Sequence, residues 1–330
     1  MTLEELDNLV ARGTGYVPDE PDARHFELEA FLGAGDMEQL PETFQIRVPF
    51  VTAQGGIPSC TAHATTTMKS VQEEVRLSPR FNYAWSKHND GYKGYGTTFV
   101  NALSVLREYG AVEESDYPDQ NTLPEPQYTN AALIPQSLME KAATYKSKSY
   151  VAIPREVQKL KAALYKYFLP VLCGMEWFQS YNRIGKDGKI PEMQGSSVGH
   201  AFVCTGWTED AFIFQNSFGP DWGDNGKFYV PQNELMRLYQ SMFVTIDMPK
   251  EEAKVIVDEY RRTLPDPVFA KKWAGHILWA ADSRGEVYWV NPKTHKRTEL
   301  KFNTEGITEF VSKKLWVPMK MQDIQKIELI

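Results

Sequence analysis

Residues 54–60 read Gln54-Gly55-Gly56-Ile57-Pro58-Ser59-Cys60, and the chain continues as Thr61-Ala62-His63-Ala64-Thr65-Thr66-Thr67-Met68. The first part is a glycine- and proline-bearing loop, and the second predicts a helix from Cys60 to about Arg76. Ser59 and Thr61 are both able to cap its first turn, where unpaired N–H groups carry partial positive charge. A thiol at that end of a helix is pushed toward the thiolate, which attacks carbonyl carbons. Cys60 is therefore a candidate nucleophile, and Gln54 a candidate donor to an oxyanion.

A cysteine without partners is more often a small buried hydrophobe, so the prediction depends on groups elsewhere in the chain. His200 opens an apolar, strand-like run at residues 198–207, and Asn216 follows a second such run at 211–215. An imidazole can take the thiol proton and later protonate a leaving amine. An asparagine carbonyl can hold that imidazole in the useful tautomer. The order Gln, Cys, His, Asn thus predicts a thiol-based acyl transfer site.

Three segments resemble the motifs of the papain-like cysteine peptidases, which read Gln-Gly-x-x-x-Ser-Cys, His-Ala and Asn-Ser-Trp-Gly-x-x-Trp-Gly-x-x-Gly. The likeness covers roughly residues 39–247. It is similar to the compact bacterial or archaeal type, which often has Pro-Asp-x-Pro-Asp-x-Arg before a Leu-Pro start, here residues 18–24 and 40–41. The resemblance implies that Cys60 is the nucleophile, His200 the general base, Asn216 its orienting partner and Gln54 the oxyanion donor.

The resemblance also implies an α+β, two-lobed papain-like fold, a helical lobe plus a β-barrel-like lobe with the active site between them. The sequence agrees, because helical patterns come first, including 79–85, 101–109 and 155–167, with 114–135 as loop. Strands are predicted later, at 171–175, 198–206, 211–215, 227–230 and 242–247. We expect an N-terminal strap or short pro-segment at 1–39, a peptidase domain at 40–248, and a linker helix with a small C-terminal α+β domain at 249–330.

Five further residues are implied as substrate-binding by their positions in the family pattern: Gly96, Thr97, Val198, Gly199 and Trp222. Gly199 stands where many relatives have Asp or Asn, which predicts that this side of the cleft is open. Phe218 stands where the family has a tryptophan over the Asn–His hydrogen bond, and its ring still predicts an aromatic lid. His63 is one helical turn past Cys60, so it is expected to point away from the cleft and to be structural.

The tail predicts strands at 276–280, 286–290 and 298–302, then helices at 310–315 and 321–327. Over roughly residues 274–328 it resembles a small module of exported bacterial proteins, with Gly-Glu-x-Trp/Tyr-x-Val-Asn-Pro followed by Lys-Arg. None of its residues carries recognisable chemistry. We expect it to be an accessory domain that attaches the chain to an assembly partner.

Composition and charge limit which binding partners and which cellular compartment are expected. The chain has 330 residues, a formal charge of -7 and no basic run, which argues against nucleic acid or an anionic membrane as the main partner. Residues 1–7 are acidic rather than typical of a signal peptide. Cys173 and Cys204 lie in apolar runs and are expected to be free, which indicates folding in a reducing compartment. We expect a bacterial or phage protein, cytoplasmic, part of a particle, or exported by a non-Sec route.

The predicted substrate is a peptide or protein, and no metal or organic cofactor is needed, since no histidine has metal-ligand spacing with cysteine or acidic residues. Two alternatives stay open. One is a papain-fold binding or structural protein attached to a larger assembly by its tail. The other is an acyl-transferring, transpeptidase-like thiol enzyme, which uses the same Cys-His chemistry.

Overall fold

A computed structural model describes residues 3–12, 14–19, 40–91, 94–167, 170–246, 277–280, 287–290, 293, 297–299 and 316–319. The chain forms two compact units. The first contains residues 1–21 and 27–250, and the second contains residues 22–26 and 251–330. Each unit is described by itself.

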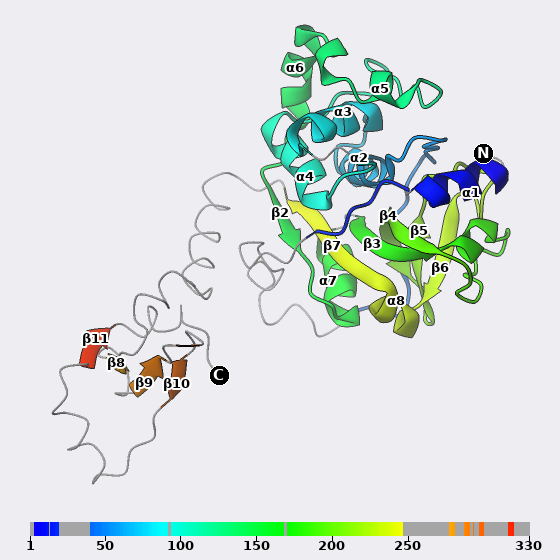
Figure 1. Ribbon diagram of the computed structural model, residues 1–330. Coiled ribbons are helices and arrows are strands. Elements are labelled where there is room, and N and C mark those ends of the chain that lie inside the picture. The colour runs from blue at the N-terminus through cyan, green and yellow to red at the C-terminus, as the bar shows by residue number, and fades with distance from the viewer. Residues whose placement is uncertain are drawn as a thin grey trace. The chain divides into compact units, whose positions relative to one another are not determined.

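The first unit begins with helix α1 (Leu3–Arg12) and then gathers its helices beside a sheet (Figure 1). The further helices are α2 (Cys60–Gln72), α3 (Pro79–Asn89), α4 (Phe99–Glu108), α5 (Glu125–Tyr128), α6 (Gln136–Ala142), α7 (Val157–Tyr167) and α8 (Gln232–Leu238). Short 3-10 turns occupy Ala131–Leu133, Ala143–Tyr145 and Gln179–Arg183. Residues 114–135, predicted as loop, therefore contain the short α5 and a turn, and α6 was not predicted.

The sheet of this unit is antiparallel, in the order β2-β7-β3-β4-β5-β6, with β1 pairing with β4. Its strands are β1 (Phe44–Gln45), β2 (Ser149–Ala152), β3 (Val171–Phe178), β4 (Ser197–Trp207), β5 (Ala211–Gln215), β6 (Lys227–Pro231) and β7 (Tyr239–Ile246). The five predicted strands are confirmed, with longer bounds for β3 and β7. A helical group and an antiparallel sheet together give the predicted α+β architecture.

Helix α2 connects the two halves of this unit, because it packs against both α4 and strands β3 and β4. Every residue from Cys60 to Ser70 is buried. Threonines are weak helix formers, but Thr66 donates its hydroxyl to the Ala62 carbonyl at 2.8 Å, so burial leaves that group satisfied. The helix ends at Gln72, earlier than predicted, and Glu74 has a left-handed φ of 54°. Packing on both sides fixes the position of Cys60.

The second unit contains a four-stranded sheet in the order β10-β9-β8-β11. Its strands are β8 (Ile277–Ala280), β9 (Val287–Val290), β10 (Arg297–Glu299) and β11 (Trp316–Met319). The first two match the predicted hairpin, whose strands pair antiparallel. Strand β11, parallel to β8, was not predicted. The predicted linker helix and the two predicted helices of the tail lie outside the described residues.

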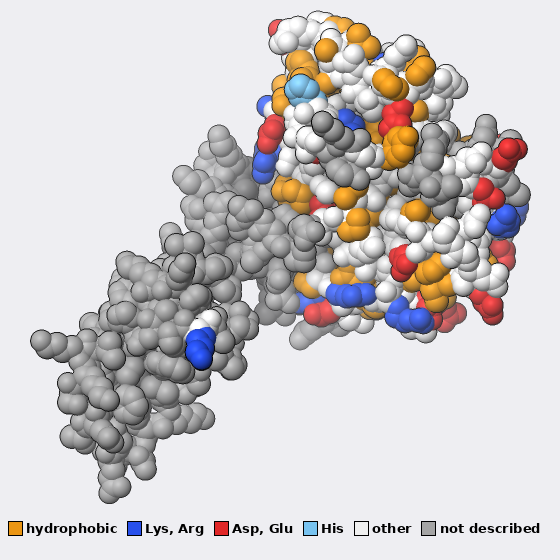
Figure 2. Space-filling view, in the orientation of Figure 1, with side chains coloured by type: hydrophobic (Ala, Val, Ile, Leu, Met, Phe, Trp, Pro, Cys, Tyr) orange, Lys and Arg blue, Asp and Glu red, His pale blue; other side chains and the backbone are white. Residues whose placement is uncertain are grey.

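Acidic and basic side chains are interspersed on the face of the first unit shown in Figure 2. Within the described part of the chain, no helix has the length and apolar character needed to span a membrane. Among the same residues, no cluster of three or more His, Cys, Asp and Glu side chains is arranged to hold a metal ion.

Candidate active site

Cys60 is the first residue of α2 and is fully buried. Ser59 occupies the N-cap position, but its side chain accepts no N–H from the first turn; its hydroxyl donates instead to the Ile57 carbonyl at 3.4 Å. Thr61 also directs its hydroxyl elsewhere, to the Gly15 carbonyl at 2.9 Å. The predicted side-chain caps are therefore wrong. At this helix end the backbone N–H of Cys60 donates to the Thr14 carbonyl at 3.3 Å.

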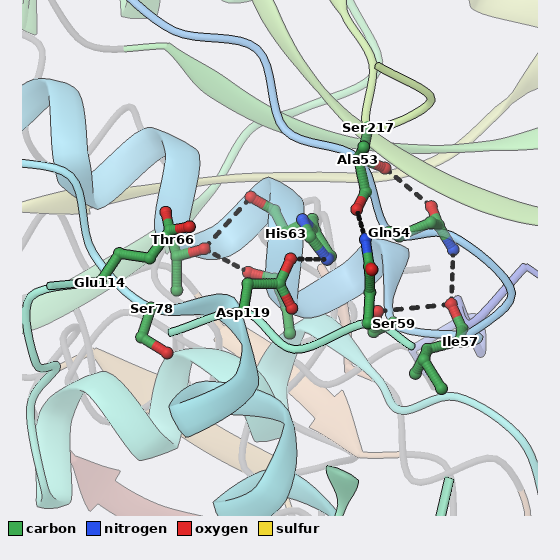
Figure 3. A network of polar contacts seen from close by, with 12 residues as sticks. Ala53, Gln54, Ile57, Ser59, His63, Thr66, Ser78, Glu114, Asp119 and Ser217 are labelled. Carbon is green, nitrogen blue, oxygen red and sulfur yellow. Dashed lines mark hydrogen bonds and ion pairs between the residues drawn. The ribbon is translucent and has the colours of Figure 1, made fainter. Parts of the chain in front are cut away.

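Gln54 is held by hydrogen bonds at both ends of its amide group (Figure 3). Its Oε1 accepts a hydrogen bond from the Ser217 hydroxyl at 2.7 Å. Its Nε2 donates to the Ile57 carbonyl at 2.9 Å. Because the carbonyl end of the amide is fixed by Ser217, the donor end is the one presented beside Cys60.

His200 and Asn216 form the second half of the site. His200 Nε2 lies 2.8 Å from Asn216 Oδ1, so Nε2 carries the proton in a neutral ring and Nδ1 is left without a hydrogen-bond partner. Phe218 stacks on the imidazole, with ring centroids 4.8 Å apart, and is the predicted aromatic lid. Trp177 packs against the imidazole in a T-shaped arrangement, with ring centroids 4.7 Å apart. The ring is thus locked in one tautomer with its acceptor nitrogen available.

A segment from the N-terminus lies across these groups, and we call residues 14–19 the covering segment. The Thr14 carbonyl accepts hydrogen bonds from Gln54 Nε2 at 2.9 Å and from the Cys60 backbone N–H at 3.3 Å. The Cys60 thiol donates to the Thr14 hydroxyl at 3.6 Å. That hydroxyl in turn donates to the Gly199 carbonyl at 2.5 Å. A peptide carbonyl of the chain itself therefore occupies Gln54 Nε2, the predicted oxyanion donor, together with the Cys60 N–H.

The covering segment continues as an extended strand beside the loop at residues 96–97. Thr97 donates its N–H to the Gly15 carbonyl, and Val17 donates its N–H to the Thr97 carbonyl, both at 3.0 Å. Glycine is required at position 96, because a Cβ there would lie 2.5 Å from the Gly15 oxygen. Asp19 then accepts the first N–H groups of α4, from Phe99 at 3.3 Å and Val100 at 2.8 Å. A carboxylate at a helix N-terminus is favourable, so Asp19 anchors the segment.

Burial sets the protonation of the covered site. Desolvation raises the pKa of Cys60 to about 12, although hydrogen bonds from Thr14 and from the Ala201 backbone favour the thiolate. Desolvation lowers the pKa of His200 to about 3, against the hydrogen bond with Asn216, which raises it. The covered site therefore holds a neutral thiol and a neutral imidazole. The predicted push toward thiolate at the helix end is outweighed by removal of water.

The structure brings four of the five predicted substrate-binding residues against the N-terminal region. Gly96, Thr97 and Gly199 contact the covering segment, and Trp222 lines a cavity of about 450 Å³ together with Leu6 of α1. Val198 lies on β4 opposite Trp177, and its role stays a prediction. The space beside Gly199, which was expected to be open, is filled by the covering segment, because a Cβ there would lie 2.6 Å from the Tyr16 oxygen.

Four residues of this region were missed by sequence reasoning: Thr14, Tyr16, Asp19 and Ser241. Tyr16 places its hydroxyl 2.5 Å from Ser241 Oγ, which also donates to Asp19 Oδ2 at 3.3 Å. Asp19 belongs to the Pro-Asp-x-Pro-Asp-x-Arg stretch, which was a usable signal. Ser241, on a half-buried strand, carries no local signal.

His63 makes no hydrogen bond to Cys60 or to His200. It is fully buried, and its Nε2 lies 3.5 Å from Asp119 Oδ2 (Figure 3). Burial lowers the pKa of His63, against the opposing effect of Asp119. The contact places His63 on the side of α2 that faces the helical group, as predicted for a structural residue.

Comparison with known proteins identifies the family to which the chain belongs. The model of the papain family of cysteine proteases matches residues 40–245, and the chain belongs to that family. It is 28% identical over 218 residues to a probable cysteine protease, RDL6, of Arabidopsis thaliana, covering 61% of this chain and 57% of that protein. It is 29% identical over 201 residues to falcipain-3 of Plasmodium falciparum, covering 53% of this chain and 37% of that protein. The chain thus spans about half or less of these relatives.

Among solved structures, xylellain, a cysteine protease from Xylella fastidiosa, superposes with a TM-score of 0.63 at 24% identity, covering 72% of this chain and 97% of that one. A procathepsin B of Trypanosoma congolense gives a TM-score of 0.58 at 14% identity, covering 76% and 90%. At these identities the likeness concerns the fold. It confirms the predicted papain-like architecture of the first unit.

Proposed function

We propose that the chain is a cysteine peptidase that hydrolyses peptide bonds through Cys60, His200, Asn216 and Gln54, and that its covering segment holds it inactive. The observation that carries the proposal is the Thr14 carbonyl, which accepts hydrogen bonds from both Gln54 Nε2 and the Cys60 N–H. Two N–H donors that converge on one peptide carbonyl beside a thiol are the arrangement that stabilises the oxyanion formed when a thiol attacks a peptide bond. Membership of the papain family supports the same reaction.

The reaction follows from the available atoms. Once water and substrate replace the covering segment, the Cys60 thiol passes its proton to His200 Nδ1, and the sulfur attacks the scissile carbonyl carbon. Gln54 Nε2 and the Cys60 N–H donate to the resulting oxyanion. The imidazolium then protonates the leaving amine as the C–N bond breaks, which leaves a thioester. His200 next removes a proton from water, which attacks the thioester and releases the acid and the thiol.

Asn216 and Phe218 act on the imidazole rather than on the substrate. The hydrogen bond from Nε2 to Asn216 Oδ1 keeps Nδ1 as the proton-accepting nitrogen throughout the cycle. The Phe218 ring covers that hydrogen bond from solvent, which strengthens it. Proton transfer therefore stays directed at Cys60 and the leaving amine.

Active-site labelling tests the proposal. Full-length Tyr16→Ala, chosen because it weakens the covering segment, is treated near pH 6 with a stoichiometric epoxysuccinyl inhibitor of cysteine peptidases, and its intact mass is measured. We expect one adduct that is lost in the added Cys60→Ala or His200→Ala variant. The matched controls, Cys173→Ala and His88→Ala, should label fully.

Equal labelling with and without His200 would contradict the proposed thiol activation. Labelling without hydrolysis of any peptide, but with peptide joined to an added amine, would instead favour the acyl-transfer alternative. No labelling of folded Tyr16→Ala would favour the binding-protein alternative.

A further inference from the structure

Two side chains of α3 hold the loop at residues 94–97. The Gly96 N–H donates to the Tyr83 hydroxyl oxygen at 3.0 Å. The Lys87 ammonium donates to the carbonyls of Gly94 and Gly96, each at 3.0 Å. Both backbone polar groups of Gly96 are therefore bonded to α3, and its φ of 85° lies in the left-handed region that favours glycine. The conformation of this loop thus depends on the two side chains.

The next residue, Thr97, directs its backbone toward the covering segment. Its N–H donates to the Gly15 carbonyl, and its carbonyl accepts from the Val17 N–H, both at 3.0 Å. Its side chain is fixed separately, because Thr97 Oγ1 accepts from Asn101 Nδ2 at 2.7 Å. Backbone hydrogen bonds of this kind recognise the main chain of an extended peptide, whatever its side chains are. Thr97 thus offers one donor and one acceptor to any extended chain that replaces the covering segment.

The Gly96 carbonyl and the Thr97 N–H belong to one planar peptide group, in which they point in opposite directions. A donor bonded to the carbonyl therefore fixes the direction of the N–H. Lys87 supplies that donor, and its largely buried ammonium lies 3.4 Å from Asp90 Oδ2, which balances the charge. A charged donor also polarises the peptide group, which makes the N–H on the other side a stronger donor. Lys87 thus orients and strengthens the hydrogen bond that the Thr97 N–H makes.

Tyr83 links this loop to the loop that precedes Cys60. Its side chain is fully buried. The hydrophobic cluster to which it belongs also contains Ile57, Ala62 and Tyr128. Burial raises the pKa of Tyr83, so the phenol stays neutral and its oxygen accepts the Gly96 N–H. Removing the hydroxyl would leave that N–H unpaired in a buried position, which is costly.

We propose that Tyr83 and Lys87 are positioning residues, which set the backbone of the loop at 96–97 so that it binds the main chain of an extended peptide substrate. The inference rests on the proposed peptidase function. Both residues act through the Thr97 backbone and take no part in bond cleavage. Their loss should therefore weaken the binding of substrate rather than slow the chemical step.

The first test compares KM and kcat in full-length Tyr16→Ala, in which the covering segment is weakened. Hydrolysis of a fluorogenic peptide is measured for this variant alone and with Tyr83→Phe or Lys87→Met added. The loss of one buried hydrogen bond corresponds to a roughly 5- to 30-fold rise in KM, with kcat unchanged. The matched controls, Tyr109→Phe and Lys141→Met, remove a hydroxyl and an ammonium from exposed hydrogen bonds and should leave KM unchanged.

A second measurement separates the positioning of Thr97 from a general loosening of the enzyme. Peptides that carry one backbone N-methyl group, at a different amide in each, are compared by kcat/KM, with the scissile amide left unmodified. The methyl group removes an N–H and blocks close pairing, so one peptide should lose its contact with Thr97. For that peptide, Tyr83→Phe and Lys87→Met should change kcat/KM by less than about 2-fold, whereas the other peptides should show the full loss.

Unchanged KM in both variants would overturn the inference, and so would a fall in kcat/KM of equal size for every methylated peptide. A fall in kcat with unchanged KM would also overturn it, because the two residues would then act on the chemical step. Each of these results leaves the peptidase function standing, since hydrolysis is still observed.

If no peptide is hydrolysed, the proposed function fails, and the loop is then tested by hydrogen exchange in the otherwise wild-type, covered protein. With Tyr83→Phe or Lys87→Met, the Thr97 amide should exchange roughly 5- to 30-fold faster. The Ile46 amide, which donates to the Thr205 carbonyl in the same unit, should keep its exchange rate. Unchanged exchange at Thr97, or equal acceleration at both amides, would refute the positioning role.

Discussion

The covering segment makes a quantitative prediction for Tyr16→Ala. In the covered form the Tyr16 ring is buried against Phe99 and bonded to Ser241, and in the uncovered form it is exposed. Removing a buried aromatic side chain costs about 3–5 kcal/mol, which here falls on the covered form alone. Taking ~3–4 kcal/mol, the equilibrium between uncovered and covered forms should rise roughly 100- to 1000-fold.

The assay is the rate at which Cys60 reacts with an alkylating reagent in folded protein, followed by intact mass. If the covering segment opens and closes faster than the reagent reacts, and the open form is rare, the alkylation rate is proportional to the equilibrium constant between the open and covered forms. Tyr16→Ala should therefore react about 100- to 1000-fold faster than wild type. Tyr16→Phe loses only the hydrogen bond to Ser241, about 1 kcal/mol, and should react roughly 5-fold faster.

The matched control is Tyr95→Ala, because Tyr95 is 48% exposed and belongs to the same loop region. It should leave the rate unchanged. Equal alkylation rates for wild type and Tyr16→Ala, with both proteins folded, would refute the argument that the Tyr16 ring holds the segment in place.

Three further predictions follow from the site. The pKa of His200 is about 3 when the site is covered and 6.5 when the imidazole is free, so the open form binds more protons below pH 6.5 and acid favours opening. Between pH 7 and 5 the hydrogen-exchange protection of the Thr97 amide should therefore fall roughly 25-fold after correction for intrinsic exchange. Unchanged protection would exclude this linkage. Gln54→Ala in the Tyr16→Ala background should lower kcat of hydrolysis about 100- to 1000-fold. A loss confined to KM would place Gln54 in substrate binding instead. Asp19→Ala removes the carboxylate that accepts two N–H groups at the start of α4; losing about 1.5–3 kcal/mol of stabilisation of the covered form should speed Cys60 alkylation roughly 10- to 100-fold. The matched control Asp187→Ala, at an exposed aspartate, should leave the alkylation rate unchanged. Equal rates for Asp19→Ala and wild type would exclude an anchoring role for Asp19.

The sequence predicted the papain-like fold and the pairing of His200 with Asn216, because motif spacing carries that information. Cys60 was predicted to begin a helix, and it does; His200 was predicted at the head of a strand, and it is the fourth residue of β4. The helices α5 and α6 were missed because Pro124 and Pro135 were interpreted as loop residues. Both prolines stand at the N-cap of a short helix, where a missing N–H costs nothing.

The sequence allowed a strap or short pro-segment at residues 1–39, but the group that occupies the site could not be predicted from it. The group that fills the oxyanion position is the Thr14 backbone carbonyl, and every residue has such a carbonyl. Its placement depends on contacts with residues 40 and 185 positions away, at Gln54 and Gly199. The neutral thiol and imidazole follow from that burial, so the sequence-based expectation of a thiolate does not describe the covered site.

Hydrolysis of an unfolded protein substrate at pH 6 is the most direct test of the central claim, that a competent thiol site is closed by the chain's own N-terminal segment. Wild type, Tyr16→Ala and Tyr16→Ala/Cys60→Ala are compared at equal concentration. We predict slow hydrolysis by wild type, hydrolysis about 100-fold or more faster by Tyr16→Ala, and none by the double variant. Equal rates for the first two would contradict closure by the covering segment, and hydrolysis by the double variant would contradict Cys60 as the nucleophile.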